Sequence, residues 1–191
     1  PLVRGLRLNT VMPLKGTPHE TLKRLSGYGP PLWVDLKGRQ LRVVGAAIPP
    51  FTEVRVSHPL SVETPADCFF DDGREYARVM EVDGDRLILE DTPRRFVGPG
   101  ESINIVHPSL KIDGTLTPTD KDYLSAMKEL GMTRVMLSYC EEAADVEEVK
   151  ALLPGAEVVL KIESLKGLDL AARQGDRQGR LMAARGGLYV E

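Results

Sequence analysis

A lysine and a glutamate stand two residues apart at the end of an apolar run, Val159-Leu160-Lys161-Ile162-Glu163. Side chains at positions i and i+2 of a β-strand point to the same face, so Lys161 and Glu163 would lie side by side. A carboxylate at the end of a parallel strand could hold Mg²⁺, and a neighbouring lysine could stabilise negative charge that develops during a reaction. The spacing alone is equally compatible with a simple Lys–Glu ion pair.

Two more polar pairs have the same spacing at other expected strand ends: Arg7 with Asn9, and Asp35 with Lys37. Charged side chains directed into the mouth of a sheet are costly unless they are paired or used. In α/β folds the site lies at the carboxyl ends of the strands. A single pair could simply be a solvated strand end, but three such pairs at three strand ends are less easily explained in that way. The segment 184–187, Ala-Arg-Gly-Gly, could line an anion-binding nest, although an ordinary glycine turn explains it as well.

The elements that would position these residues alternate between strand and helix at both ends of the chain. Thr117 and Pro118 have the residue types of a helix N-cap and first turn. Alternating strands and helices favour βαβ units with a parallel sheet. We expect strands at 6–9, 32–36, 134–138, 157–162 and 180–184, and helices at 18–26, 118–130, 142–153 and 165–173.

The middle of the chain has a different pattern, with short apolar runs separated by turn residues. Asp72-Gly73 and Asp83-Gly84 are typical of β-hairpin turns. No helix is expected there, and strands are expected near 41–44, 53–56, 74–82, 86–89 and 102–106. The sequence thus predicts an α/β fold: a partial (β/α)8 TIM-type barrel of residues 1–38 and 110–191, with an inserted small all-β, barrel-like domain at 39–109.

The predicted barrel part is about half the size of a complete barrel, which takes about 250 residues. Half a barrel exposes sheet edges and apolar strand faces. We therefore expect a homo-oligomer, or association with the missing part of the barrel.

Composition excludes several classes of protein. Hydrophobic residues make up 42% of the chain and the net charge is −3, which argues against global disorder and against a broad nucleic-acid-binding surface. No apolar run reaches the length of a membrane span, and the first residues do not resemble a secretory signal. Two cysteines and three scattered histidines form neither a disulfide framework nor a zinc motif. These observations predict a cytoplasmic protein with neither nucleic acid nor membrane as a partner.

Several segments, in the same order along the chain, together resemble the pyruvate kinase family. They are similar to the family motifs R-x-N-x-S-H-G, D-T-K-G-P-E-I-R, D-D-G, L-x-x-x-D-x-x-D, K-I-E and M-V-A-R-G-D-L-G. The corresponding segments here are Arg7–Asn9 with His19–Thr21, Val34–Arg42, Phe70–Gly73, Leu116–Asp122, Val159–Glu163 and Leu181–Leu188.

The resemblance implies a glycolytic transferase that moves a phosphoryl group between phosphoenolpyruvate and ADP, giving pyruvate and ATP, with Mg²⁺ (or Mn²⁺) and K⁺ as cofactors. It implies Lys161 as the phosphoryl-transfer lysine and Glu163 as a magnesium ligand. Asn9 and Asp35 would be potassium ligands. Arg7 and Arg42 would contact phosphates, and the backbone of Ala184, Arg185, Gly186 and Gly187 would receive the substrate carboxylate.

The sequence also departs from the family pattern. Gly187 stands where the family has the second metal-binding aspartate, and Val11 and Leu36 stand where it has the serine and threonine of the potassium site. Half of each ion site therefore lacks its side-chain oxygen, and we expect an impaired reaction. Two alternatives stay open: a catalytically degenerate relative that binds a phosphorylated or carboxylate ligand or a partner protein, and metal-assisted enolate chemistry such as aldol cleavage.

Overall fold

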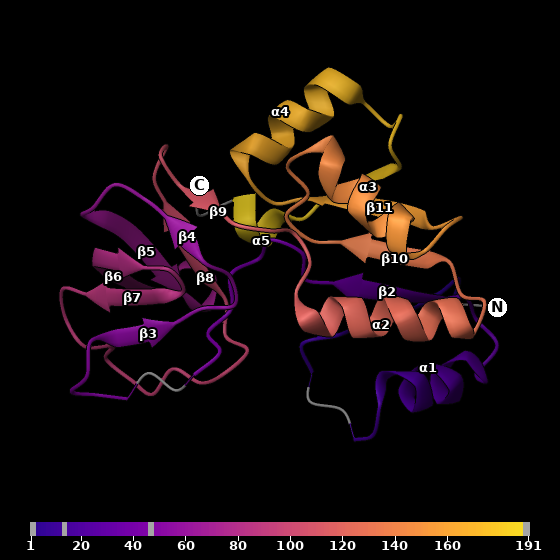
Figure 1. The fold of residues 1–191 in the computed structure, drawn as a ribbon, viewed down its shortest axis with the longest axis horizontal. Coiled ribbons are helices and arrows are strands. Elements are labelled where there is room, and N and C mark those ends of the chain that lie inside the picture. Colours follow the sequence, from indigo (N-terminus) through magenta and orange to yellow (C-terminus); the bar gives the residue numbers. More distant parts are fainter. Residues whose placement is uncertain (1–2, 13–14, 46–47, 189–191) are drawn as a thin grey trace. The chain divides into compact units, whose positions relative to one another are not determined.

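The computed structural model describes residues 3–12, 15–45 and 48–188. The chain divides into two compact units (Figure 1). The first unit combines the N-terminal segment up to Gly38 with Thr115–Ala184, and the second contains Arg39–Gly114 and the segment that begins at Arg185. The chain thus leaves the first unit after Gly38 and returns to it at Thr115.

The first unit is built on a five-stranded parallel sheet in the order β1-β2-β10-β11-β12. Each strand pairs with the next strand of the unit along the chain, as successive βαβ connections produce. All of these strands were expected from the sequence. Their bounds are β1 Leu6–Asn9, β2 Leu32–Leu36, β10 Arg134–Leu137, β11 Glu157–Ile162 and β12 Arg180–Ala183.

Four helices connect or follow these strands: α1 Pro18–Ser26, α2 Pro118–Glu129, α3 Ala143–Leu152 and α4 Leu165–Gln174. The hydroxyls of Thr17 and Thr117 cap the first two, each in a capping box followed by proline. Ser164 caps α4 through the N–H of Gly167. These local signals explain why the helices begin where the sequence predicts.

One face of the parallel sheet and the helices enclose the core of the first unit. Helix α1 packs on α2, and α2 packs on α3. Alternate residues of the strands are fully buried there, among them Val34, Leu36, Val135, Leu137 and Leu160. The intervening residues, including Arg7, Asp35 and Lys161, belong to the opposite face because strand side chains alternate.

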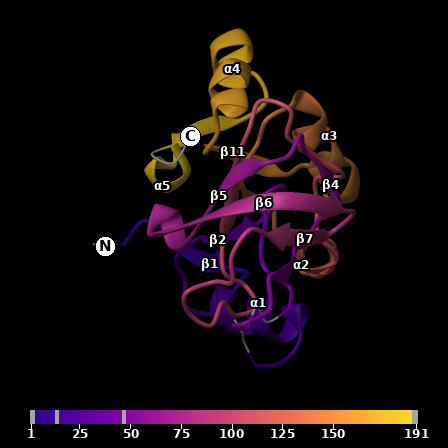
Figure 2. The ribbon, with the colours of Figure 1, turned by 90° about the vertical axis from the view of Figure 1, so that its left-hand side faces the viewer.

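The second unit contains a five-stranded antiparallel sheet in the order β3-β7-β6-β5-β8, and the small pair β4-β9. Figure 2 shows the long strand β6 crossing the larger sheet. The bounds are β3 Glu53–Arg55, β4 Leu60–Ser61, β5 Ala66–Phe70, β6 Glu75–Asp83, β7 Arg86–Leu89, β8 Ile103–Val106 and β9 Lys111–Ile112. A separate core, centred on fully buried Phe70 and Leu87, lies within this unit.

The two Asp-Gly signals lie at the two expected turns. Asp83 pairs with Arg86 at the end of the β6–β7 hairpin, and the turn passes through Gly84. The β5–β6 connection is the short 3₁₀ turn η1, Asp71–Gly73, in which Asp71 has a φ of 49° and Gly73 a φ of 89°. Both glycines therefore supply the left-handed backbone that tight turns need.

The structure differs from the expectations for the middle segment in three respects. Strands β4, β5 and β9 were not expected. Residues 41–44 make only single bridges, Arg42 with Ser102 and Val43 with Val56. The unit ends at Gly114 rather than at residue 109, because β9 pairs with β4 of the same unit and so belongs to it.

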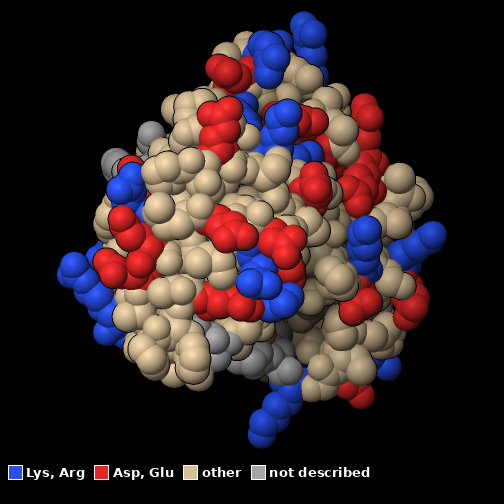
Figure 3. Space-filling model, turned by 60° about the vertical axis from the view of Figure 1, so that its left-hand side comes forward, with Lys and Arg blue, Asp and Glu red and all other residues tan. Residues whose placement is uncertain are grey.

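Figure 3 shows acidic and basic side chains interspersed over one face of the molecule, as the small net charge suggests. Within the described residues, no helix combines the length and the apolar character needed to cross a membrane. The last helical turn, α5 Arg185–Leu188, follows β12 and belongs to the second unit.

Candidate active site at the carboxyl ends of the parallel strands

Four of the six paired residues that the sequence places at strand ends, Asp35, Lys37, Lys161 and Glu163, meet in one buried cluster within the first unit, and half-exposed Arg7 reaches it. The register of the strands explains why these side chains are neighbours. Asp35 on β2 pairs with Met136 on β10, and Met136 pairs with Val159 on β11. The N–H of Ser138, just past the end of β10, donates to Leu36 O. Asp35 and Ser138 are fully buried, and Lys37, Lys161 and Glu163 are each less than a tenth exposed. A buried cluster of this composition persists only where its charges are paired.

Asp35, at the end of β2, is surrounded by cationic side chains. Arg7 donates from Nε to Oδ2 at 2.8 Å and from Nη2 to the same oxygen. Lys161 Nζ lies 3.3 Å from Oδ1, and Lys37 Nζ lies 3.8 Å from Oδ2. Burial alone would raise the pKa of Asp35, but the charges of Lys161, Lys37 and Arg7 outweigh burial and hold this pKa below its ordinary value.

Lys161, on β11, connects three acceptors. Its ammonium donates to Ser138 Oγ at 2.7 Å, lies 3.3 Å from Asp35 Oδ1 and pairs with Glu163 Oε1 at 3.4 Å. Ser138 Oγ in turn donates to Asp35 Oδ1 at 3.3 Å. The ammonium therefore has a partner for each of its three protons, which fixes its position in the cluster.

Glu163 follows the end of β11, and its two oxygens have different partners. Oε1 faces Lys161, and Oε2 accepts the backbone N–H of Tyr139 at 3.0 Å. Tyr139 has a φ of 47°, an uncommon value for a residue other than glycine. Residues held in this region cluster at functional sites, where surrounding contacts maintain them.

Asp120, in the first turn of α2, fixes the end of β2 from outside the cluster. Its Oδ1 accepts the N–H of Lys37 at 2.9 Å, and its Oδ2 accepts the N–H groups of Gly38 and Thr117, both at 3.1 Å. One fully buried carboxylate thus caps a helix and holds the backbone next to the Lys37 side chain. Charge-assisted hydrogen bonds of this kind are stronger than neutral ones.

The other residues expected at the site are engaged elsewhere or belong to the second unit. Asn9 Oδ1 accepts the N–H of Val11 at 3.3 Å. The N–H of Ala184 donates to Ile162 O within the sheet. Arg42 belongs to the second unit, where its Nη1 donates to Gly100 O at 2.9 Å and its Nη2 to Gln40. Arg185, Gly186 and Gly187 also belong to that unit, so their proposed contacts with substrate stay predictions.

The donor atoms present suit the two expected cations differently. Glu163 offers one carboxylate, and Mg²⁺ often takes one or two protein carboxylates and fills its other positions with water and phosphate oxygens, but the ion would have to share oxygens that already meet Lys161 and the N–H of Tyr139. Asp35 is a poor potassium ligand here, since Arg7, Lys37 and Lys161 already supply positive charge to its oxygens. Among the described residues no group of three or more acidic, histidine or cysteine side chains is arranged to hold a metal.

Sequence reasoning missed two contributors, Ser138 and Tyr139. Ser138 lies two residues beyond Met136 on the same strand face, so the period-two rule already directs it to the cluster face. A role for Ser138 was not predicted, because an uncharged serine takes part in the cluster only through its partners on other strands. For Tyr139 the contributing group is a backbone N–H, which carries no signal in the sequence.

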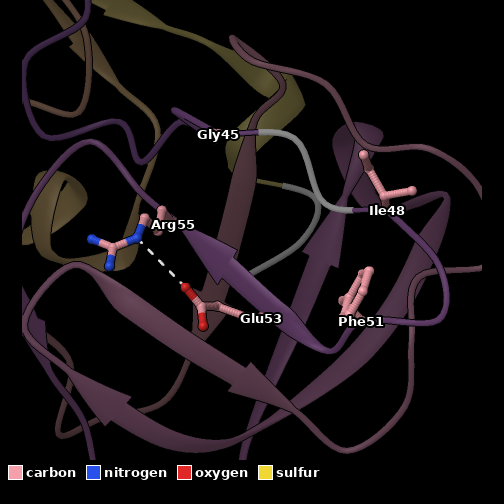
Figure 4. Close-up of a pocket in the computed structure, with 5 residues that line it drawn as sticks. All are labelled: Gly45, Ile48, Phe51, Glu53 and Arg55. Carbon is pink, nitrogen blue, oxygen red and sulfur yellow. Dashed lines mark ion pairs between the residues drawn. The ribbon is translucent and has the colours of Figure 1, made fainter.

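A depression of about 380 Å³ lies in the second unit, lined by Gly45, Ile48, Phe51, Glu53 and Arg55 (Figure 4). Its charged groups, Glu53 and Arg55, pair with each other at 3.5 Å. Phe51 is 69% exposed beside them. The described residues that line this depression do not bring together polar groups as the strand-end cluster does.

No protein-family model matches the chain. A pyruvate kinase from Agrobacterium vitis is 33% identical to it over 126 residues, which are 65% of this chain and 26% of the relative. The chain therefore spans about a quarter of the length of this curated relative. The similarity points to a distant, partial relationship with pyruvate kinase, and it agrees with the resemblance that the strand-end motifs indicate.

Proposed function

We propose that the strand-end cluster is a pyruvate-kinase-like site that takes phosphoenolpyruvate and passes its phosphoryl group to ADP, with a rate reduced by Gly187. The observation that carries the proposal is the buried Lys161 beside Glu163, at 3.4 Å, at the carboxyl end of a parallel strand. The partial similarity to a pyruvate kinase supports the same reading.

Three residues at the site have tasks in this reaction. Lys161 presents a fixed positive charge to the phosphoryl group and to the enolate oxygen that is released. Arg7 has a half-exposed side chain and can bind phosphate oxygens while its Nε and Nη2 stay on Asp35. Glu163 would hold Mg²⁺, which when bound would neutralise further negative charge on the phosphoryl group. Burial of Lys161 and Glu163 strengthens their electrostatic interactions.

We further propose that the parallel sheet is part of a (β/α)8 barrel completed by further chain or by a second copy. The support is the strand order, in which each strand pairs in parallel with its successor in the unit. Among the described residues, strands β1 and β12 form the two edges of this sheet, where backbone groups face away from their paired strands.

A second candidate is anion binding without transfer. The convergence of Arg7, Lys37 and Lys161 on one carboxylate favours it, because these cations can hold a phosphate or carboxylate ligand without a metal. In that case phosphoenolpyruvate binds whether or not Mg²⁺ is present, and no ATP forms.

Mg²⁺ titration by calorimetry tests the proposal. Gly187→Asp restores the second carboxylate of the family pattern and should tighten Mg²⁺ binding and raise ATP formation from phosphoenolpyruvate and ADP. Glu163→Gln should weaken Mg²⁺ binding, whereas Asp169→Asn, at an exposed position of α4, serves as the control. If neither Gly187→Asp nor Glu163→Gln changes Mg²⁺ affinity, the cluster is not a metal-dependent transfer site.

A further inference from the structure

Ser138 and Tyr139 form a two-residue segment that reaches both proposed functional side chains at once. The Ser138 hydroxyl accepts from Lys161 Nζ at 2.7 Å, and the next N–H, that of Tyr139, donates to Glu163 Oε2 at 3.0 Å. Lys161 lies on β11 and Glu163 directly follows it, and the segment, which follows the neighbouring strand β10, approaches both from that side. Both contacts are buried.

We infer that Ser138 is a positioning residue for Lys161, and that the left-handed backbone at Tyr139 is the device that lets one segment hold Lys161 and Glu163 together. The consequence for phosphoenolpyruvate binding rests on the proposed function, whereas the positioning itself does not.

The hydrogen-bond geometry explains how Ser138 acts. Its hydroxyl proton goes to Asp35 Oδ1 at 3.3 Å, which leaves the oxygen lone pairs for the Lys161 ammonium. The oxygen therefore serves as an acceptor toward Lys161 and as a donor toward the carboxylate that balances its charge. Without it, Lys161 keeps only its two carboxylate contacts, both longer than 3.2 Å.

The φ of 47° at Tyr139 explains how the same segment stays on the β11 side. The N–H of Ser138 donates to Leu36 O of β2, so the N–H of Tyr139 faces the β11 side, and an extended Tyr139 would turn the following N–H back toward β2. The left-handed φ at Tyr139 instead rotates the chain that follows, so the next N–H, of Cys140, faces the same side as the Tyr139 N–H that donates to Glu163. The following N–H, of Cys140, returns to the sheet by donating to Lys161 O at 3.3 Å. The turn is thus anchored to β11 on both sides of Ile162.

The test is the reactivity of Lys161 toward an amine-specific acylating reagent in the intact chain, followed by peptide mass spectrometry. Ser138→Ala removes an acceptor from the ammonium and frees the side chain, so Lys161 should be modified roughly three- to tenfold faster, as loss of one buried hydrogen bond implies. Ser138→Thr keeps the hydroxyl and should restore slow modification. Thr115→Val is the control, because it also removes a buried hydroxyl that donates to a carboxylate, here Asp145.

Phosphoenolpyruvate binding separates this inference from the proposed function. If the wild type binds phosphoenolpyruvate, Ser138→Ala should weaken that binding and Ser138→Thr should recover it. Faster Lys161 modification in Ser138→Ala, with no phosphoenolpyruvate binding in the wild type, would support the positioning role and reject the proposed function. Equal Lys161 modification rates in wild type, Ser138→Ala and Thr115→Val would overturn the positioning role.

Discussion

Neutralising Asp35 should be among the most damaging single changes to the first unit. Asp35→Asn keeps the shape of the side chain but leaves Lys37 and Lys161, both buried, and Arg7 without their shared counter-charge. Removing one partner from a buried ionic group costs about 3–5 kcal/mol. The total stability of a domain is about 5–15 kcal/mol, so the loss would be a large fraction of it.

The assay can observe this unit separately. Trp33 is the single tryptophan of the chain and lies on β2, two residues before Asp35. Urea unfolding followed by Trp33 fluorescence therefore reports the first unit without relying on two-state behaviour of the whole chain. Asp169→Asn makes the same chemical change on an exposed face of α4 and should cost no more than about 0.5 kcal/mol.

The pH dependence gives the prediction a second, signed readout. The pKa of Asp35 is lowered in the folded state, so its contribution is present above the ordinary aspartate pKa, about 4, and disappears as pH falls through the lower folded value. The stability difference between wild type and Asp35→Asn should therefore shrink as pH falls below about 4. A difference under about 1 kcal/mol at pH 7, or one that grows in acid, would refute the view of Asp35 as a buried counter-ion.

Two further predictions concern backbone and thiol chemistry. Gly38→Ala should destabilise the first unit, because Gly38 has a φ of 52° and an added Cβ would lie 2.5 Å from Ser138 O. A variant that unfolds at or above the thermal unfolding temperature of the wild type would contradict this. Burial, and to a smaller extent the negative charge of Asp67, raises the pKa of the Cys68 thiol to about 12. At pH 8 a thiol reagent should therefore label Cys68 only when the second unit unfolds. Rapid labelling of the native chain would show that this core opens.

Local rules in the sequence predicted the elements of the first unit well. Thr17 and Thr117 each precede a proline and an acidic residue at the capping-box position, so α1 and α2 begin where expected. The buried strands read as short apolar runs, and the period of two correctly assigned Lys161 and Glu163 to one face. These features depend on neighbours within a few residues, which a single sequence records.

What the sequence did not predict depends on partners distant along the chain. Strand β5, Ala66–Phe70, has an aspartate and a cysteine in its centre, and it forms because β6 and β8 pair with it on both sides. Asp120 reads as an ordinary capping residue, yet it also accepts N–H groups from residues more than 80 positions earlier. Tertiary pairing overrides or extends local preference in both cases.

The same distant contacts connect the cluster to the points where the chain leaves and re-enters the first unit. Asp120 holds the N–H groups of Lys37 and Gly38, and the equally buried Asp145 accepts the hydroxyl of Thr115 at 2.8 Å. Each carboxylate also takes part in the capping box of its own helix, α2 or α3. Because the Lys37 side chain pairs with Asp35, a shift of the backbone at Gly38 would disturb the counter-ion of Lys161 as well. The two crossings are therefore fixed on the side of the first unit.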